Sequence, residues 1–233
     1  MGSVWYCIPS ARPPEEAKKC LSKWKAMGYK IALWRDSVEY PFGIADYVRV
    51  GKYPGYARAV NALAFDVLRD WIVTGGDDTD PDPNLTAEEI AAQLTAHFGG
   101  TFGVCQPTGD RFAFSKAQGS APIDRVAGSP WLGREWCLRA NQGKGPLWPE
   151  YTHMFVDEEL QNVAIKYGVF WQRPDLIHLH HHYQRVSDAI NSPAQVREAP
   201  PHLVEVNKRE HWDKYKAIFE ARKRAGFPGS EPL

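Results

Sequence analysis

The first half of the chain alternates short apolar runs with longer segments in which apolar residues recur every three or four positions. The short runs predict strands, and their continuous apolar character indicates burial on both faces of a sheet. They cover residues 4–8, 30–34, 46–50, 71–74 and 102–106. The periodic segments predict helices at residues 17–27 and 60–68, and a further helix after a capping box formed by Thr86 and Glu89.

The second half is less regular. Gly, Pro and Trp are dense at residues 128–149, which predicts a long loop, and residues 193–201 have the composition of a linker. The elements expected there are a short helix at residues 134–139, a helix at 157–167, a strand at 177–183 and a basic, aromatic helix at 208–224.

Strands that alternate with helices predict an α/β fold with a mainly parallel, twisted sheet, right-handed crossovers and flanking helices. The last helix would form a C-terminal helical appendage to this domain. Ligands of such sheets bind beyond the carboxyl ends of the strands. We therefore expect the functional residues at that edge.

Composition narrows the function classes. The chain has 233 residues, enough for one substantial core, and its 28 basic residues balance its 28 acidic ones. Zero net charge excludes a polycation that coats nucleic acid. No apolar stretch approaches the ~20 residues of a membrane span, and no signal peptide is recognisable, so a cytoplasmic protein without membrane partners is expected. The scattered cysteines, expected to be reduced and buried, are Cys7, Cys20, Cys105 and Cys137.

Four aspartates follow one predicted buried strand, at positions 77, 78, 80 and 82. Clustered carboxylates repel one another unless a cation or strong donors compensate them. Oxygen ligands on a loop suit Mg²⁺ or Mn²⁺, particularly where substrate phosphates complete the shell. A solvated turn is the alternative, because Asp and Pro are common turn residues.

Histidines form a second cluster, at positions 178, 180, 181 and 182. In a strand, His178, His180 and His182 would share one face and His181 would lie on the other. Such spacing can bind a metal ion. A third acidic group, Asp157-Glu158-Glu159, lies at a predicted helix start, where it either complements the helix dipole or supplies a general base.

Taken in order over residues 4–183, these pieces resemble the GT-A fold of nucleotide-sugar glycosyltransferases, most closely family 2. The Asp cluster resembles the D-x-D motif that precedes Pro-Asp-Pro, with Gly76 at the first Asp and Asp78 at the second. Asp157 to Leu160 is similar to the E-D-x-x-L segment, with Val156 in place of its Glu. Residues 174–182 resemble the strand that supplies a histidine to the metal.

The resemblance also extends to the donor site. Strand one ends in Cys7-Ile8-Pro9-Ser10, where the family has its nucleotide-binding loop, and Asp36 matches its nucleobase-facing aspartate. Residues 55–61 look like the family's Ala-Arg-Asn segment, although Val60 replaces the expected Arg. The nucleotide-sugar-binding residues implied are Pro9, Ser10, Arg12, Asp36, Arg58, Asn61 and Asp77.

The resemblance implies a metal-dependent, inverting glycosyltransferase that uses a nucleotide-diphosphate sugar, first of all a UDP-sugar. Mn²⁺ or Mg²⁺ would be held by Asp78, Asp80 and the histidines His178, His180 and His182. Asp157 would be the catalytic base, and Glu158 is the alternative candidate for that role. We expect a nucleotide-sugar-binding half at residues 1–106, an acceptor half at 107–190, and a linker, basic helix and tail at 191–233.

The acceptor is the most open part of this interpretation. Trp131, Trp136 and Trp148 either stack on a sugar or acceptor, or pack in the core. The compact chain also resembles small bacteriophage glycosyltransferases, some of which modify hydroxymethylated bases in DNA. Interleaved basic and aromatic residues at 201–227, with Trp212 and Tyr215, are compatible with a DNA acceptor.

Several alternatives remain open at this stage. They are a glycosyltransferase that acts on a small-molecule or saccharide acceptor, a metal-dependent nucleotidyltransferase, a non-catalytic nucleotide-sugar binding module, and a zinc hydrolase built on the histidines. No protein partner is inferred. Product analysis with several nucleotide sugars, with and without EDTA, separates these classes.

Overall fold

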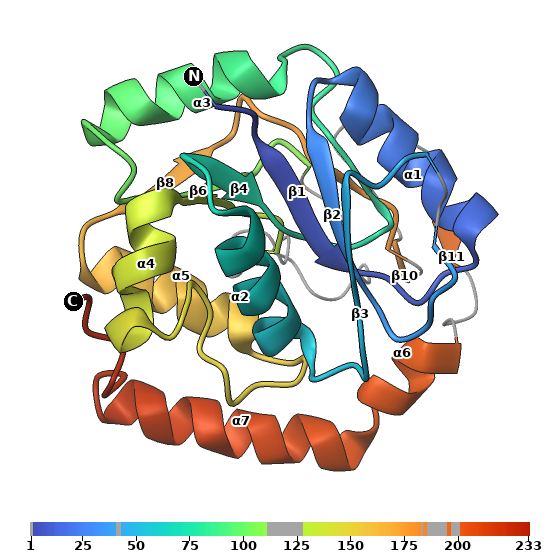
Figure 1. Cartoon of the computed structure of the whole chain (residues 1–233). Coiled ribbons are helices and arrows are strands. Elements are labelled where there is room, and N and C mark those ends of the chain that lie inside the picture. Colours follow the sequence, from blue (N-terminus) through green and yellow to red (C-terminus); the bar gives the residue numbers. More distant parts are fainter. Residues whose placement is uncertain (1, 41–42, 111–127, 183, 186–194, 197–200) are drawn as a thin grey trace.

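A seven-stranded sheet with the order β3-β2-β1-β4-β7-β6-β8 forms the centre of the computed structural model (Figure 1). Its strands are β1 (Trp5–Pro9), β2 (Lys30–Arg35), β3 (Tyr47–Val50), β4 (Trp71–Val73), β6 (Val104–Pro107), β7 (Trp131–Gly133) and β8 (Phe170–Arg173). All neighbours are parallel except β7, which runs antiparallel to β4 and β6. The structure describes residues 2–40, 43–110, 128–182, 184–185, 195–196 and 201–233.

Helices cover both faces of the sheet. They are α1 (Pro14–Ala26), α2 (Tyr56–Val67), α3 (Ala87–Phe98), α4 (Arg134–Gly143), α5 (Val156–Lys166), α6 (Pro201–Val206) and α7 (Arg209–Arg224). Residues of α1 and α3 share one buried cluster with one face of the sheet, whereas α2, α4, α5 and α7 contribute to the cluster on the other face. This arrangement confirms the α/β fold with a mainly parallel sheet.

Local signals set several of these boundaries. The capping box at the start of α3 is confirmed, since Thr86 Oγ1 accepts the Glu89 N–H at 3.3 Å and Glu89 Oε2 accepts the Thr86 N–H at 2.8 Å. Gly99 ends the same helix in the left-handed conformation, with φ +64°. The apolar runs around Ile8, Leu33 and Ile72 become central strands, as expected for segments buried on both faces.

Short strands of the second half differ from the expectation. The strand predicted at residues 177–183 is reduced to β9 (Leu179–His180), which pairs with β5 (Thr79–Asp80) in a separate two-stranded sheet. Another small sheet joins β10 (Gln184–Arg185) to β11 (Gln195–Val196). Neither β5 nor β7 was predicted, because two or three residues are too few to show a period.

The loop expected at residues 128–149 is largely packed. Trp131 lies in β7 and Trp136 in α4, and both are at most 1% exposed, while Trp148 is 8% exposed. Buried indoles cannot stack on a ligand at the surface. Of the two alternatives left open for these three tryptophans, their burial therefore favours core packing.

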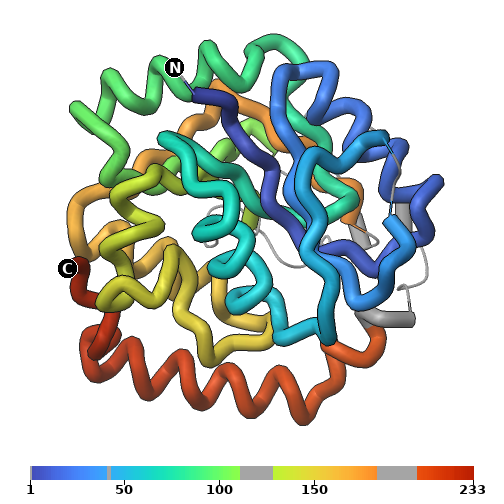
Figure 2. Tube along the Cα trace, viewed as in Figure 1, coloured from blue at the N-terminus to red at the C-terminus, as the bar shows by residue number. Residues whose placement is uncertain are grey.

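The C-terminal helix is present and packs closely on the domain. Tyr215 and Phe219 of α7 and the following Phe227 are buried in the same cluster as α2 and α5. Figure 2 shows the C-terminal segment running along the edge of the molecule and ending beside the segment that contains α4. With Tyr215 buried, the basic and aromatic surface that favoured DNA is smaller than the sequence indicated. The linker predicted at residues 193–201 lies mostly outside the described residues.

Two simple expectations concern cysteines and membranes. All four cysteines are free and buried, as predicted. Burial raises the pKa of the Cys20 thiol to about 12, so this thiol stays protonated and unreactive at neutral pH. Among the described residues, no helix has the length and apolar character that a bilayer crossing requires.

Candidate functional site

The carboxyl ends of β1 and β4 bring two loops together, because these strands are parallel neighbours. Ser10 and Arg12 follow β1, and Asp77 follows β4. Ser10 Oγ donates a hydrogen bond to Asp77 Oδ2 at 2.6 Å, and Arg12 Nε donates one to Asp77 Oδ1 at 2.6 Å. The Asp77 carboxylate therefore joins the two loops.

Asp78 occupies the centre of the site, between Arg12 and His180, which come from the two halves of the chain. Its Oδ2 lies 3.5 Å from Arg12 Nη2, and its Oδ1 lies 3.4 Å from His180 Nε2. Burial alone would raise the pKa of Asp78, but His180 and Arg12 outweigh it and hold the pKa well below its usual range. Asp78 is thus a carboxylate at neutral pH and is suited to a cation.

Gly76 explains the departure from the D-x-D pattern. A Cβ added at position 76 would lie 2.5 Å from Asp78 Oδ1, so a side chain there would displace that carboxylate. The Gly76 carbonyl accepts a hydrogen bond from Tyr6 OH at 2.6 Å, which fixes the loop from the sheet side. Asp77 and Asp78 consequently present the carboxylates of this loop.

Arg35 supports the loop after β1 and was not identified from the sequence. It is 3% exposed, and its Nη1 donates to the Ser10 carbonyl at 2.9 Å and to the Arg12 carbonyl at 2.7 Å. A cation at the end of an apolar strand gives no periodic signal. Its role becomes visible only when the two loop carbonyls converge on it.

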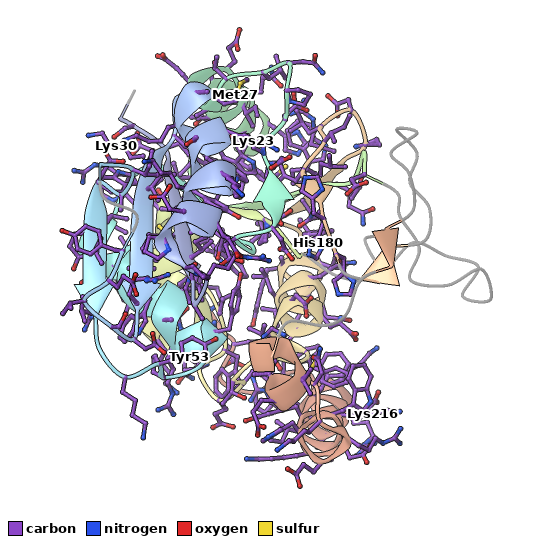
Figure 3. The ribbon with its side chains drawn as sticks, turned by 90° about the vertical axis from the view of Figure 1, so that its right-hand side faces the viewer. Lys23, Met27, Lys30, Tyr53, His180 and Lys216 are labelled. Carbon is purple, nitrogen blue, oxygen red and sulfur yellow. The ribbon has the colours of Figure 1, made fainter. Side chains whose placement is uncertain are left out.

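The segment that includes β9 closes the site from the other half of the chain. Thr79 pairs with His180, and the His181 N–H donates to the Asp78 carbonyl at 2.8 Å. The His180 N–H donates to Asp110 Oδ2 at 2.8 Å, a contact that the sequence did not indicate. Figure 3 shows His180 close to α5.

Asp80 and His181 form a second pair beside the first. Asp80 Oδ2 lies 2.7 Å from His181 Nε2 and 2.6 Å from Lys23 Nζ. Burial favours a higher pKa for Asp80, but the hydrogen bonds of His181 and Lys23 lower it overall. The structure therefore pairs Asp80 with His181, while His180 and His182 lie together beside Asp78, so His181 is separated from these two as strand alternation predicted.

The other histidines of the cluster take different environments. The His182 ring lies 5.2 Å from the His180 ring, next to the Asp78 pair. His178 is 3% exposed, and its Nδ1 lies 3.1 Å from both the carbonyl and the hydroxyl of Ser129. Burial lowers the pKa of His178 to about 4. His178 therefore belongs to the core beside Trp24, not to the Asp78 group.

Asp157 lies in the first turn of α5. Its Oδ1 accepts the Glu158 N–H at 3.0 Å. Burial raises the pKa of Asp157, while backbone hydrogen bonds and the nearby His180 oppose the rise. Glu158 is half-buried beside it. A carboxylate with a raised pKa has one of the properties of a general base.

The remaining expected donor residues lie in other surroundings. Asn61 is buried, and its amide binds the carbonyls of Lys144 and Leu147 and the N–H of Leu147. Arg58 Nε donates to the Pro149 carbonyl at 3.0 Å. These two residues hold the segment after α4 rather than the Asp78 group. Asp36 is exposed after β2, and Pro9 is half-buried at the end of β1.

The geometry fits a divalent cation only if water and substrate supply most of the ligands. The described residues include no group of three or more His, Cys, Asp or Glu side chains arranged to hold a metal ion. Asp78 and His180 nevertheless converge within 3.4 Å. Mg²⁺ usually takes few protein ligands and completes its shell with water and substrate phosphates. Asp78, with His180 beside it, therefore fits a metal that arrives with a phosphorylated substrate.

Solved structures of S. aureus TarS share this fold. The complex of TarS 1–349 with UDP matches 76% of this chain and 59% of that chain, with 11% identity and a TM-score of 0.54. The complex with UDP-GlcNAc matches 93% of this chain and 65% of that one, with 9% identity and a TM-score of 0.54. Another structure of S. aureus TarS matches 95% of this chain and 43% of that one, with 12% identity and a TM-score of 0.52.

These matches cover less than two thirds of each TarS chain. No family model matches the sequence, and neither does any curated protein. At identities this low, the likeness establishes the fold and leaves the activity to be argued from the site. The chain thus has the GT-A-like α/β fold that its motifs predicted.

Proposed function

We propose that the protein is a metal-dependent, inverting glycosyltransferase that transfers a sugar from a UDP-sugar to an acceptor hydroxyl. The observation that carries this proposal is the position of Asp78 between Arg12 and His180, with the half-buried Asp157 near the same histidine. The site thus joins a place for a cation and phosphates to a carboxylate that can accept a proton. The UDP and UDP-GlcNAc complexes of TarS support the choice of a UDP-sugar.

Arg12 is the residue that we assign to the diphosphate. Its guanidinium carries donors in a planar fork, which suits phosphate oxygens. It lies against Asp77 and Asp78. Arg35 holds the carbonyls on either side of this loop, so the loop is prepared before the donor binds. Asp78 and His180 would hold Mg²⁺ or Mn²⁺, which supplies positive charge against the departing diphosphate.

Asp157 is the residue that we assign to proton transfer. The acceptor oxygen forms a bond to the anomeric carbon, while the bond from that carbon to the diphosphate breaks and its electron pair leaves with the phosphate. The acceptor proton passes to the Asp157 carboxylate. Its raised pKa strengthens it as a base, since a carboxylate of ordinary pKa is a weak base at neutral pH.

The acceptor is proposed as an alcohol, with a hydroxymethylated pyrimidine of DNA as one case and a saccharide or small molecule as the other. The structure gives DNA less support than the sequence did, because Tyr215 is buried and Arg222 pairs with the buried Glu159. Acceptor assays with single-stranded DNA that contains hydroxymethylated bases, and with free saccharides, separate these cases.

The test of the function is product analysis with a panel of nucleotide sugars. We expect release of UDP and sugar transfer in Mn²⁺ or Mg²⁺ and none in EDTA, with activity restored by added metal. Asp78→Asn should abolish turnover, whereas Asp70→Asn serves as a charge-matched control, because Asp70 is exposed and directly precedes β4, at the end of that strand opposite Asp78. Full turnover by metal-stripped protein in EDTA would contradict the metal-dependent mechanism, and release of pyrophosphate in place of UDP would indicate a nucleotidyltransferase.

A further inference from the structure

Glu159 of α5 carries a buried charge that one residue of the C-terminal helix satisfies. Its side chain is 2% exposed, and its two oxygens accept hydrogen bonds from Arg222 Nη2 at 2.7 Å and Arg222 Nε at 2.9 Å. Tyr151 OH donates to Glu159 Oε2 at 2.7 Å. A buried carboxylate with a two-pronged partner is fixed in position more tightly than a surface pair.

Arg222 is itself held on its other face. Its guanidinium lies 3.6 Å from the centroid of the Trp148 ring, and its Nη1 donates to the Pro228 carbonyl at 3.1 Å. The side chain is 11% exposed. Arg222 therefore forms a rigid connection between α7 and α5.

A second contact between these helices lies at the start of α5. Phe155 precedes the helix with φ +66°, a left-handed conformation that a bulky residue rarely adopts. Its ring is stacked on Phe219 at 5.4 Å and lies 4.8 Å from the Trp212 ring, both on α7. Strained residues persist where the surroundings over-determine them, and here α7 supplies that packing.

Asp157 lies between these two points of attachment, two residues after Phe155 and two before Glu159. The Glu159 N–H donates to the Phe155 carbonyl at 3.0 Å, which closes the first turn around Asp157. We infer that Arg222 is a positioning residue: through Glu159, and together with the packing of Phe155, it sets the place of the Asp157 carboxylate. This inference rests on the proposed function, because it assumes that Asp157 receives the acceptor proton.

The test compares Arg222→Lys with Arg209→Lys in the full chain. Lysine keeps the charge at position 222 but loses the two-pronged geometry. Arg209 lies on the same helix and is 85% exposed in a surface pair with Asp213, so its variant is a matched control. Arg222→Met is the stronger variant, but it leaves Glu159 buried and unpaired and is used only if it folds.

Two measurements keep the outcomes apart. Turnover at saturating donor and acceptor should fall about 10–100-fold in Arg222→Lys, since small displacements of a reacting group cost this much, while UDP affinity stays within about twofold. Hydrogen exchange at the amides of residues 159–163 should become faster in Arg222→Lys and stay unchanged in Arg209→Lys. A merely structural role would lower the melting temperature without changing turnover well below it.

The negative outcomes are distinct. A wild-type protein that transfers no sugar from any donor would contradict the proposed function, and the exchange data would still decide whether Arg222 fixes the start of α5. Wild-type turnover in Arg222→Lys, measured in an active protein, would overturn the positioning role. Unchanged exchange at residues 159–163 would overturn it as well, whatever the activity.

Discussion

Replacing Asp82 by Ala is expected to destabilise the protein strongly, although the sequence placed this residue in a cluster of metal-binding character. The side chain is 1% exposed, and its carboxylate accepts three backbone N–H groups. Two belong to its own turn, Asn84 at 2.8 Å and Leu85 at 3.0 Å. The third is Ile177 at 2.8 Å, directly before the histidine segment. Asp82 therefore ties the loop after β4 to the segment that includes β9.

The magnitude follows from these three bonds. A hydrogen bond to a charged acceptor contributes about 1.5–3 kcal/mol, and an unsatisfied buried donor costs a similar amount. Asn84 is exposed, so water can replace part of what the N–H groups of its turn lose. We expect a loss of about 3–5 kcal/mol in the free energy of unfolding for Asp82→Ala.

Urea unfolding followed by circular dichroism measures this loss, with Asp36→Ala as the control. Asp36 is exposed, and its replacement should change the unfolding free energy by no more than about 0.5 kcal/mol. A loss below about 1 kcal/mol for Asp82→Ala would refute the conclusion that Asp82 ties the loop after β4 to the segment that includes β9. A stable variant that has lost metal-dependent turnover would instead indicate that Asp82 takes part in metal binding.

Four further predictions concern the site. Asp157→Asn should reduce turnover about 10²–10⁴-fold with UDP affinity unchanged; a lower melting temperature with wild-type turnover would make Asp157 a helix cap only. His180→Ala should raise the metal concentration needed for half-maximal turnover. His181→Ala removes the partner of Asp80 and should mainly lower the melting temperature. The reverse pattern would contradict the pairing of His180 with Asp78 and of His181 with Asp80. Arg12→Met should weaken UDP binding in calorimetry, and equal affinity would exclude a diphosphate contact. Burial lowers the pKa of His178 to about 4 from an ordinary 6.5. As the pH falls, this histidine therefore gains a proton in the unfolded chain before it does so in the folded protein. The stability present above pH 6.5 then declines by at most about 1.4 kcal/mol per pH unit towards pH 4. Urea unfolding at several pH values should show a flatter profile for His178→Phe if this origin is correct.

Much of the fold follows from local patterns, and much of the site does not. The strands that contain Ile8, Leu33 and Ile72 were predictable because continuous apolar runs have few alternatives. Asp78 and His180 became candidates because clustered carboxylates need compensation and closely spaced histidines can bind a metal ion. Arg35 and Asp110 were missed, since neither has a neighbour in sequence that reveals its partner.

The region that contains the tryptophans was predicted as a loop, and the structure shows it packed. A region rich in Gly and Pro indicates a loop at the surface, but here the loop region folds back, and Trp131 and Trp136 fill the two faces of the sheet. The histidines show how register limits prediction. Strand alternation placed His178 with His180, whereas the strand is only two residues long and His178 lies in the core. Tertiary packing decides such cases.

The contacts that close the site join positions far apart in the chain, and this has a consequence for the order of folding. Arg12 and Asp77 are 65 positions apart, Ile177 and Asp82 are 95, and His181 and Asp80 are 101. Closing loops of this length costs entropy before any contact rewards it, so such pairings form late. The helices and the β1–β2 pair can nucleate early, while the carboxylates after β4 remain hydrated and mutually repelling until the histidine segment arrives. Pulse-labelling during refolding should therefore protect the amides of β1 and β2 first and the His180 and His181 amides last.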